Sequence, residues 1–384
     1  MPSEQVGLPD IETLRMLDGV KWTRHGPDVI PAWVADMDIR PPAAVLDTLT
    51  ALIDRRDFGY NFHARDQLPE AFAAWQHDHH GWNPDPGRVR LFCDILHGID
   101  TVLWHHTAPG DGVVLLTPVY PPFLKALEQS GRRLVDVPLD PDGWRLDRDR
   151  LAAAIDDGTT AMLICNPHNP TGRVFDADEL DAIAQVAADH DLLVLMDEVW
   201  GDLVHPGATH VPLALHDTEA ARRTITFSSA SKTFNLAGLR CAVAHVGSDV
   251  VANALDALPM HLTGAVGTPG AEATLAAWSD TSGWLDDLRR HLGDRRDQAI
   301  GRLRAEWPNV GVQSPEATYL LWLDLRQSGL GDDPAATILD KGRLALSPGP
   351  DFGLRGLGFA RLNVATSAEV LDLVLDRLGD ALGN

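Results

Sequence analysis

The sequence predicts an α/β protein with a mostly parallel sheet covered by helices on both faces, and a second, smaller α+β domain. Between about residues 88 and 246, short continuous apolar runs alternate with helical stretches, which is typical of parallel strands buried on both faces. After about residue 267, helical segments precede two separate strand-like runs. The chain has 384 residues and is therefore longer than one ordinary domain.

The main sheet is predicted from six apolar runs. A helix is predicted between the third and fourth runs, because FDADELDAIAQVAADH opens with acidic capping residues and then repeats apolar positions at helical spacing. The predicted strands are Val89–Phe92, Val113–Leu116, Ala161–Cys165, Leu192–Met196, Thr224–Phe227 and Cys241–Val246.

The predicted division of the chain is an N-terminal arm (1–45) that packs with the small domain, a large domain (46–270) and a small C-terminal domain (271–384). The arm is suggested by prolines at positions 31, 41 and 42. The small C-terminal domain is suggested by a different pattern of elements, which consists of two helical segments, two strand-like runs and a final amphipathic helix. These segments are Pro269–Trp278, Trp284–Glu306, Tyr319–Leu325, Phe359–Ala365 and residues 367–382.

Composition and charge restrict the partners of the protein. The formal net charge of −23 argues against nucleic acid or an anionic membrane surface as the main partner. The N-terminus has no secretory pattern, and no apolar run reaches the ~18 residues that span a bilayer. We therefore expect a cytoplasmic protein. Its three cysteines lack metal-ligand spacing and are expected to be buried free thiols.

No metal site is expected either. His77, His79 and His80 lie close together, as do His105 and His106. Neither cluster supplies a convergent third ligand, so both are interpreted as surface histidines on helices.

Lys232 is the first candidate for chemistry. It is one of only four lysines, and it follows an apolar strand inside the segment TFSSASKTFNLAGLR. A lysine that reacts with a carbonyl needs its ammonium form destabilised by partial burial. Ser228, Ser229, Ser231 and Arg240 can bind a phosphate beside it. A polar loop with one exposed lysine is the alternative reading of this segment taken alone.

Two further segments place polar groups at strand ends. LICNPHNPTGRVF (163–175) must leave the sheet in a tight, rigid loop at the end where ligands bind in open α/β sheets. LLVLMDEVWGDL (192–203) places Asp197 at the end of a buried strand. A buried carboxylate is tolerable when it pairs with a cation, and a protonated pyridine nitrogen is such a cation.

In this order and spacing, the three segments resemble the fold-type I pyridoxal-phosphate (PLP) enzymes, the aspartate aminotransferase superfamily of class I/II. The resemblance implies that Lys232 binds the cofactor covalently, Asp197 pairs with its pyridine nitrogen and Asn169 bonds its phenolic oxygen. It also implies a phosphate site and a site for the substrate α-carboxylate. The phosphate site would comprise Ser229, Ser231, Arg240 and the helix start at Gly98 and Ile99, and the carboxylate would bind Arg361.

A closer resemblance connects the chain to the cystathionine β-lyase and cysteine-S-conjugate β-lyase branch. It rests on WVADMDI (33–39), FGYN (58–61), TPVYPPF (117–123), NPHNPTGRVF (166–175), DEVWGDL, SKTFNLAGL, ATYLLWLDL (317–325) and PGPDFGLRGLGFARLNVA. The chain has only three tyrosines, Tyr60, Tyr120 and Tyr319, and each falls in a segment of this resemblance. In the branch, the residue matching Tyr120 stacks on the pyridine ring. The residue matching Tyr60 reaches the neighbouring subunit's phosphate, which implies a homodimer.

The residues around the substrate follow from the same resemblance. Trp33 and Ala35 are expected beside the substrate together with Asn169, and Trp200 is expected beside the cofactor. Two positions depart from the branch. Trp200 stands where the superfamily often has Tyr and the branch usually has His, and Thr171 stands where the branch often has Val. An indole N–H cannot accept a hydrogen bond or titrate, so cofactor tuning can differ.

The predicted reaction is β-elimination from an S-substituted L-cysteine, a small-molecule substrate, to give a thiol, pyruvate and ammonia. A PLP-dependent aminotransferase is the first alternative, because the same residues serve both reactions up to the carbanion. A regulator that keeps the lyase fold and acts through a protein partner is the second alternative. A module without a cofactor would leave the cluster around Lys232 unexplained.

Overall fold

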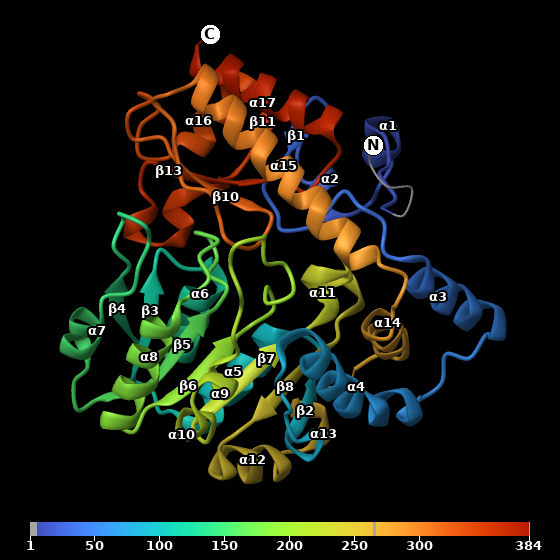
Figure 1. The fold of residues 1–384 in the computed structure, drawn as a ribbon, viewed down its shortest axis with the longest axis vertical. Helices are drawn as coiled ribbons and strands as arrows, with labels where there is room; N and C mark the ends of the chain where they lie inside the picture. Colours follow the sequence, from blue (N-terminus) through green and yellow to red (C-terminus); the bar gives the residue numbers. More distant parts are fainter. Residues whose placement is uncertain (1–5, 264–265, 384) are drawn as a thin grey trace.

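The computed structural model describes residues 6–263 and 266–383. Its largest sheet has seven strands in the order β2-β8-β7-β6-β5-β3-β4 (Figure 1). The pairs from β4 to β7 are parallel, whereas β8 is antiparallel to both of its neighbours. The strands are β2 (Val89–Phe92), β3 (Gly112–Thr117), β4 (Arg133–Pro138), β5 (Thr159–Cys165), β6 (Leu193–Asp197), β7 (Thr224–Ser228) and β8 (Ala242–Val246).

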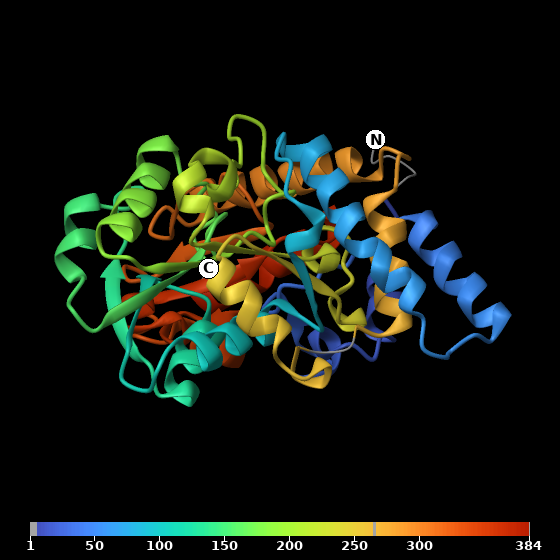
Figure 2. The same ribbon diagram turned by 90° about the horizontal axis from the view of Figure 1, so that it is seen from below.

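The predicted fold class, a mostly parallel sheet with helices on both faces, is confirmed (Figure 2). Successive strand residues point to opposite faces. Val113 and Leu115 of β3 therefore belong to one core, and Val114 and Leu116 belong to the other. The flanking helices are α5 (Ile95–His106), α6 (Pro121–Ser130), α7 (Arg148–Ala154), α8 (Ala177–Asp189), α9 (Leu213–His216), α10 (Thr218–Ala221), α12 (Asp249–Asp256) and α13 (Met260–Thr263).

The helix α8 begins where the sequence predicts it. Asp176 caps the helix by accepting a hydrogen bond from the Glu179 N–H, and the Glu179 side chain accepts one from the Asp176 N–H. This reciprocal capping box satisfies two of the backbone N–H groups that a helix start leaves without partners.

Strand β4 is absent from the prediction. It lies at the edge of the sheet, and in its sequence RLVDVP exposed residues interrupt the buried ones. A search for continuous apolar runs misses such a strand, because an edge strand has one neighbour and keeps polar residues.

The C-terminal part and the N-terminal segment come together away from the main sheet. A four-stranded sheet has the order β12-β13-β10-β9, and β1 pairs with β11 in parallel. The predicted division into an arm, a large domain and a small domain stays a prediction. The strands are β1 (Ile30–Pro31), β9 (Gly311–Val312), β10 (Leu320–Asp324), β11 (Leu344–Ala345), β12 (Ser347–Pro348) and β13 (Phe359–Asn363).

Among the remaining helices, α16 contacts β12 and β13 of the four-stranded sheet, and α4 contacts β8 of the seven-stranded sheet (Figure 1). Two others, α14 and α15, coincide with the predicted helical segments to within one residue. These helices are α1 (Ile11–Arg15), α2 (Val20–Thr23), α3 (Ala43–Arg55), α4 (Phe62–His80), α11 (Ala230–Thr233), α14 (Thr268–Trp278), α15 (Trp284–Glu306), α16 (Pro334–Gly342) and α17 (Ala368–Leu382).

Within the described ranges, none of the helices combines the length and the apolar composition that crossing a bilayer demands. The cysteines are free thiols in the structure, and Cys165 and Cys241 are buried as predicted. Cys93 is only partly buried, which corrects the expectation of three buried thiols. It follows β2 directly and lines a cavity.

Candidate active site

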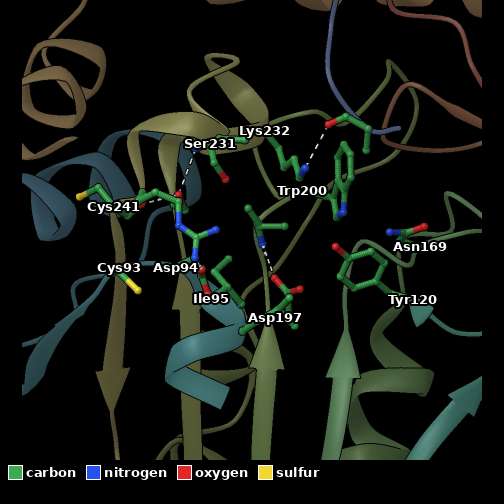
Figure 3. A pocket seen from close by; sticks show the side chains of 16 residues that line it. Cys93, Asp94, Ile95, Tyr120, Asn169, Asp197, Trp200, Ser231, Lys232 and Cys241 are labelled. Carbon is green, nitrogen blue, oxygen red and sulfur yellow. Dashed lines mark hydrogen bonds and ion pairs between the residues drawn. The ribbon is translucent and has the colours of Figure 1, made fainter. Parts of the chain in front are cut away.

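A cavity of about 200 Å³ opens at the carboxyl ends of β6 and β7. This is the edge at which open parallel sheets bind ligands. Figure 3 shows Asp197 rising from the end of its strand, with Lys232 above it, Tyr120 and Asn169 on one side, and Asp94, Ile95 and Ser231 on the other. The predicted site residues that line the cavity are Ala35, Tyr120, Asn169, Asp197, Trp200, Ser229, Ser231, Lys232 and Arg240.

Lys232 lies in the short helix α11 and extends its side chain into the cavity (Figure 3). Its Nζ donates a hydrogen bond of 3.0 Å to the carbonyl oxygen of Ala35. Burial lowers the pKa of this amine, and the nearby Arg361 guanidinium acts in the same direction. The neutral form, which is the nucleophile and the base, is therefore more accessible than on a surface lysine.

Asp197 is the last residue of β6 and is buried. In the part of the chain that the structure describes, its side chain accepts one hydrogen bond, of 3.1 Å, from the Val199 N–H. Burial raises the pKa of this carboxyl to about 7, although the Val199 N–H and the Lys232 charge act in the opposite direction. A cationic ring nitrogen facing Asp197 would restore the ionised carboxylate.

Arg361 is a buried guanidinium held by neutral groups. Its Nη1 donates to Asn169 Oδ1 at 2.9 Å, and its Nη2 donates to Trp33 O and Ser347 Oγ, both at 3.1 Å. Its Nε is buried without a hydrogen-bond partner among the described residues. Burial lowers the pKa of Arg361 to about 10. Such a charge is suited to a carboxylate that arrives with the substrate.

Hydrogen-bond donors that could bind an anion line the side of the cavity opposite Tyr120 and Asn169 (Figure 3). Ile95 and Leu96, the first residues of α5, line it together with Ser229, Ser231 and Arg240. The first N–H groups of a helix have no partners within the helix and attract anions. Arg240 also forms an ion pair with Asp94, the residue that caps α5.

The prediction for Gly98 and Ile99 is wrong in position. The helix begins at Ile95, so Gly98 and Ile99 lie a full turn inside it and are buried. Ile99 belongs to the hydrophobic core. Gly98 packs so closely against β7 that a Cβ atom would lie 2.7 Å from Phe227 Cε1. Ile95 and Leu96 take their place as candidates for anion binding.

Aromatic side chains form the walls around the amine. Tyr120 precedes α6 and lines the cavity, and burial raises its pKa. The Trp200 ring centroid is 5.8 Å from Lys232 Nζ, and Tyr319 packs on the same indole edge-on at 5.0 Å. The Tyr319 hydroxyl donates to the Ala35 carbonyl at 2.9 Å. This carbonyl therefore receives hydrogen bonds from both Lys232 and Tyr319.

Besides Gly98 and Ile99, three predicted residues lie outside the cavity lining, namely Arg361, Trp33 and Tyr60. Arg361 lies directly behind the lining, because it donates to the lining residue Asn169. Trp33 contributes its carbonyl to Arg361, and its indole Nε1 donates to Lys21 O at 3.3 Å. Tyr60 is 98% exposed and contacts Phe62, also exposed, at a centroid distance of 6.4 Å.

Sequence reasoning missed Asp94 and Ile95 at the cavity. The signal for them was present, because an Asp directly before an apolar helical segment is a preferred N-cap and marks the helix start.

Within the described residues, no group of histidine, cysteine and carboxylate side chains is arranged to hold a metal ion. The donor set fits PLP. Lys232 can bind its aldehyde carbon, Asp197 its ring nitrogen, and the α5 start with Ser229, Ser231 and Arg240 its phosphate. The buried Asp197 carboxyl, which accepts a single hydrogen bond among the described residues, is the observation in the structure that calls for such a cation.

The fold and the cavity define a PLP-dependent enzyme of fold type I. Residues 36–378 match the model of the aminotransferase class I and II family, and the chain belongs to this family. It is 34% identical over 375 residues to cystathionine beta-lyase PatB of Bacillus subtilis (strain 168), covering 94% of this chain and 96% of that protein.

Solved structures agree on the fold. The PLP-bound C-S lyase from Staphylococcus hominis has a TM-score of 0.91 at 26% identity and covers 98% of both chains. N-succinyldiaminopimelate aminotransferase from Mycobacterium tuberculosis has a TM-score of 0.84 at 30% identity, covering 91% of this chain and 92% of its own.

Proposed function

We propose that this enzyme is a PLP-dependent carbon–sulfur β-lyase that converts S-substituted L-cysteines to a thiol, pyruvate and ammonia. The proposal of an amino-acid substrate rests on the buried Arg361, because its hydrogen-bond partners are all neutral and its charge can therefore pair with a substrate carboxylate. The sequence similarity to a cystathionine beta-lyase, which covers 94% of the chain, supports elimination at Cβ.

Arg361 and Lys232 have separate roles in the proposed reaction. Arg361 binds the substrate carboxylate through its planar fork, exchanging its bonds to Asn169 and Trp33 for the two carboxylate oxygens. That contact fixes the direction of the Cα–H bond. The neutral amine of Lys232 then removes the Cα proton as general base.

PLP, when bound, supplies an electron sink for the negative charge that develops at Cα. Asp197 keeps the positive charge on the ring nitrogen favourable, because a buried carboxylate is stabilised by a cation at contact distance. Elimination follows because Cβ carries the substituted sulfur of the substrate, which leaves as a thiolate with the electron pair of the Cβ–S bond.

An aminotransferase is the second candidate. It is favoured by Thr171, which completes an Asn-Pro-Thr-Gly sequence of aminotransferase type, and by the similarity to N-succinyldiaminopimelate aminotransferase. Both reactions use Lys232, Asp197 and Arg361 in the same way until the Cα proton has been removed. They differ in where the next proton or leaving group goes.

Product analysis without a keto acid separates the two reactions. The holoenzyme is incubated with cystathionine and a panel of S-substituted cysteines, and pyruvate and free thiol are measured over many turnovers. We expect equal, sustained release of both. A single turnover that leaves the cofactor as its amine, and resumes only when a keto acid is added, would identify an aminotransferase instead.

We further propose a cytoplasmic homodimer in which Tyr60 completes the neighbouring subunit's phosphate site. Tyr60 and its neighbours Phe58 and Phe62 are exposed by 98%, 65% and 51%, which is unusual for adjacent aromatic side chains on a free surface. Co-refolding Lys232→Ala with Tyr60→Ala chains tests this arrangement. Mixed dimers should regain activity because one of their two sites is intact. Activity no higher than that of either variant alone would contradict a shared site.

A further inference from the structure

A buried carboxylate lies behind the active site and joins three parts of the chain. Asp202 Oδ1 accepts hydrogen bonds from Trp75 Nε1 and from His80 Nε2, both at 3.0 Å. Its Oδ2 accepts a hydrogen bond of 2.9 Å from Thr233 Oγ1. Trp75 and His80 lie on α4, whereas Thr233 is the residue after Lys232. The interpretation of His80 as a surface histidine is therefore wrong, since its side chain is 7% exposed.

The two segments that Asp202 connects carry the main groups of the active site. Asp197 ends β6, the segment that follows it contains Trp200 and Asp202 itself, and α11 contains Lys232. Thr233 is completely buried, so its hydroxyl has a single defined environment. One carboxylate thus connects the helix that carries the amine to the segment that carries the Trp200 ring and follows Asp197.

The charge of Asp202 makes this link strong. Burial alone raises the pKa of Asp202, but hydrogen bonding from His80, the His80 charge, the Trp75 N–H and the Arg289 charge outweigh it and lower the pKa to about 2. Arg289 also donates from Nε to the Asp202 carbonyl at 2.7 Å. Hydrogen bonds to an ionised acceptor are shorter and stronger than neutral ones, so Thr233 is held by a charge-assisted bond.

Helix α11 needs such an anchor. It has only four residues, and a helix of that length is not stable by itself in water. Ser229 caps its start by accepting from the Ser231 N–H, and Thr233 ties its end to Asp202. A small rotation of α11 would swing the Lys232 amine through the cavity, because the amine lies at the end of a long side chain.

We propose that Asp202, acting through Thr233, is a positioning residue for the amine of Lys232. This inference rests on the proposed role of Lys232 as cofactor anchor and base. Asp202 does not touch the cavity and takes no proton from the substrate. It sets the place from which Lys232 attacks the cofactor aldehyde and from which its free amine reaches the Cα proton.

The test removes the hydroxyl at the end of the link. Thr233→Val preserves shape and burial but cannot donate to Asp202, whereas Thr233→Ser restores the donor. Trp75→Phe is the matched control, since it removes a hydrogen bond of similar length from the same carboxylate on the side away from Lys232. Asp202→Asn is the second variant on the carboxylate itself. Each holoenzyme is characterised by kcat, KM, thermal midpoint and the pH titration of the visible absorption band of bound PLP.

For Thr233→Val we expect kcat to fall on the order of tenfold to a hundredfold with KM nearly unchanged, because misplacement of a reacting group by about 1 Å costs rates of this size. The absorption titration should shift, and Thr233→Ser should restore both. Trp75→Phe should lower the thermal midpoint without moving the titration. If Thr233→Val and Trp75→Phe lower only the midpoint and leave kcat and the titration at wild-type values, Asp202 is purely structural and the proposal is overturned.

The absorption titration needs no substrate. An enzyme that proves to be an aminotransferase would therefore still show the shift in Thr233→Val if Asp202 positions Lys232. An unshifted titration together with active wild-type lyase would reject the role of Asp202 while leaving the proposed function intact.

Discussion

At the scale of single residues, the site is defined by buried charges whose partners are incomplete. Asp197 accepts one hydrogen bond in the described part of the chain, and Arg361 is surrounded by neutral groups. Unpaired buried charges are costly, so a fold retains them where a ligand supplies the missing partner. The cofactor ring nitrogen and the substrate carboxylate are such partners.

Arg361→Lys should show what the guanidinium fork contributes. A lysine keeps the charge but cannot present two parallel donors to a carboxylate. The loss of a charge-assisted hydrogen bond of about 1.5–3 kcal/mol should lower kcat/KM about tenfold to a hundredfold, mainly through KM. Steady-state kinetics with one S-substituted cysteine measures the effect.

Arg326→Lys provides the control for this substitution. Arg361 and Arg326 both lie over an aromatic ring, with the guanidinium carbon 5.0 Å from the centroid of Phe352 and of Phe359, respectively. The Arg326 side chain, however, is 58% exposed and pairs with Asp324. Its replacement should leave KM unchanged. An unchanged KM in Arg361→Lys as well would remove Arg361 from the substrate site.

At the scale of elements, α5 links the anion end of the cavity to the sheet. Its start presents Ile95 and Leu96 to the cavity, and Gly98 lets the helix approach β2 and β7 closely. The position of the helix start therefore depends on how closely its first turn packs. The short β2 and β7 strands place Phe92 and Phe227 against that turn.

Gly98→Ala should destabilise the enzyme despite the higher helix propensity of alanine. The added Cβ would lie 2.7 Å from Phe227 and 3.1 Å from Phe92. Overpacking typically costs about 1–3 kcal/mol, which exceeds the gain of about 1 kcal/mol from replacing a helical glycine. We expect a lower free energy of unfolding in urea and weaker PLP binding, because the helix start must shift.

Gly301→Ala tests the same substitution without the contact. Gly301 lies within α15, and a Cβ there would meet no atom within 4 Å. That variant should gain up to about 1 kcal/mol of stability. Equal effects of the two substitutions would mean that the contact of α5 with β7 is looser than the structure has it.

At the scale of the whole molecule, three buried histidines make the fold sensitive to acid. Burial lowers the pKa values of His168, His205 and His245 to about 4. Their ordinary value is near 6.5, so the unfolded chain binds protons first as the pH falls. Stability is therefore complete above about pH 6.5 and is lost progressively down to about pH 4.

His245→Phe should reduce this loss. Phenylalanine keeps the edge-on contact that His245 makes with Trp82 at 5.0 Å, and it cannot take up a proton. The free energy of unfolding, measured between pH 7 and pH 4.5, should fall less steeply in the variant, by on the order of a few kcal/mol over the range. Identical slopes would show that His245 binds its proton equally well in the folded and unfolded chains, which would contradict the lowered pKa.

Many elements of this molecule could be predicted, because the pattern of apolar and polar residues within a short segment indicates which of its residues are buried. The central strands are continuous apolar runs, and the polar segments that follow them supply Asn169, Asp197 and Lys232. Strand β4 was not predictable in this way, because its polar residues reflect its place at the edge. The helix start at Ile95 was readable from Asp94, but the resemblance placed it three residues later.

The sequence by itself determined the fold class, the cofactor and most of the residues that line the cavity, because apolar runs mark the strands and short motifs mark the polar segments that follow them. Only the tertiary structure decided the contacts between distant segments. The Ala35 carbonyl accepts a hydrogen bond from Lys232, and the Asp202 carboxylate forms hydrogen bonds with Trp75, His80 and Thr233. Such contacts depend on how helices and strands pack in three dimensions, and no local spacing or periodicity encodes that packing.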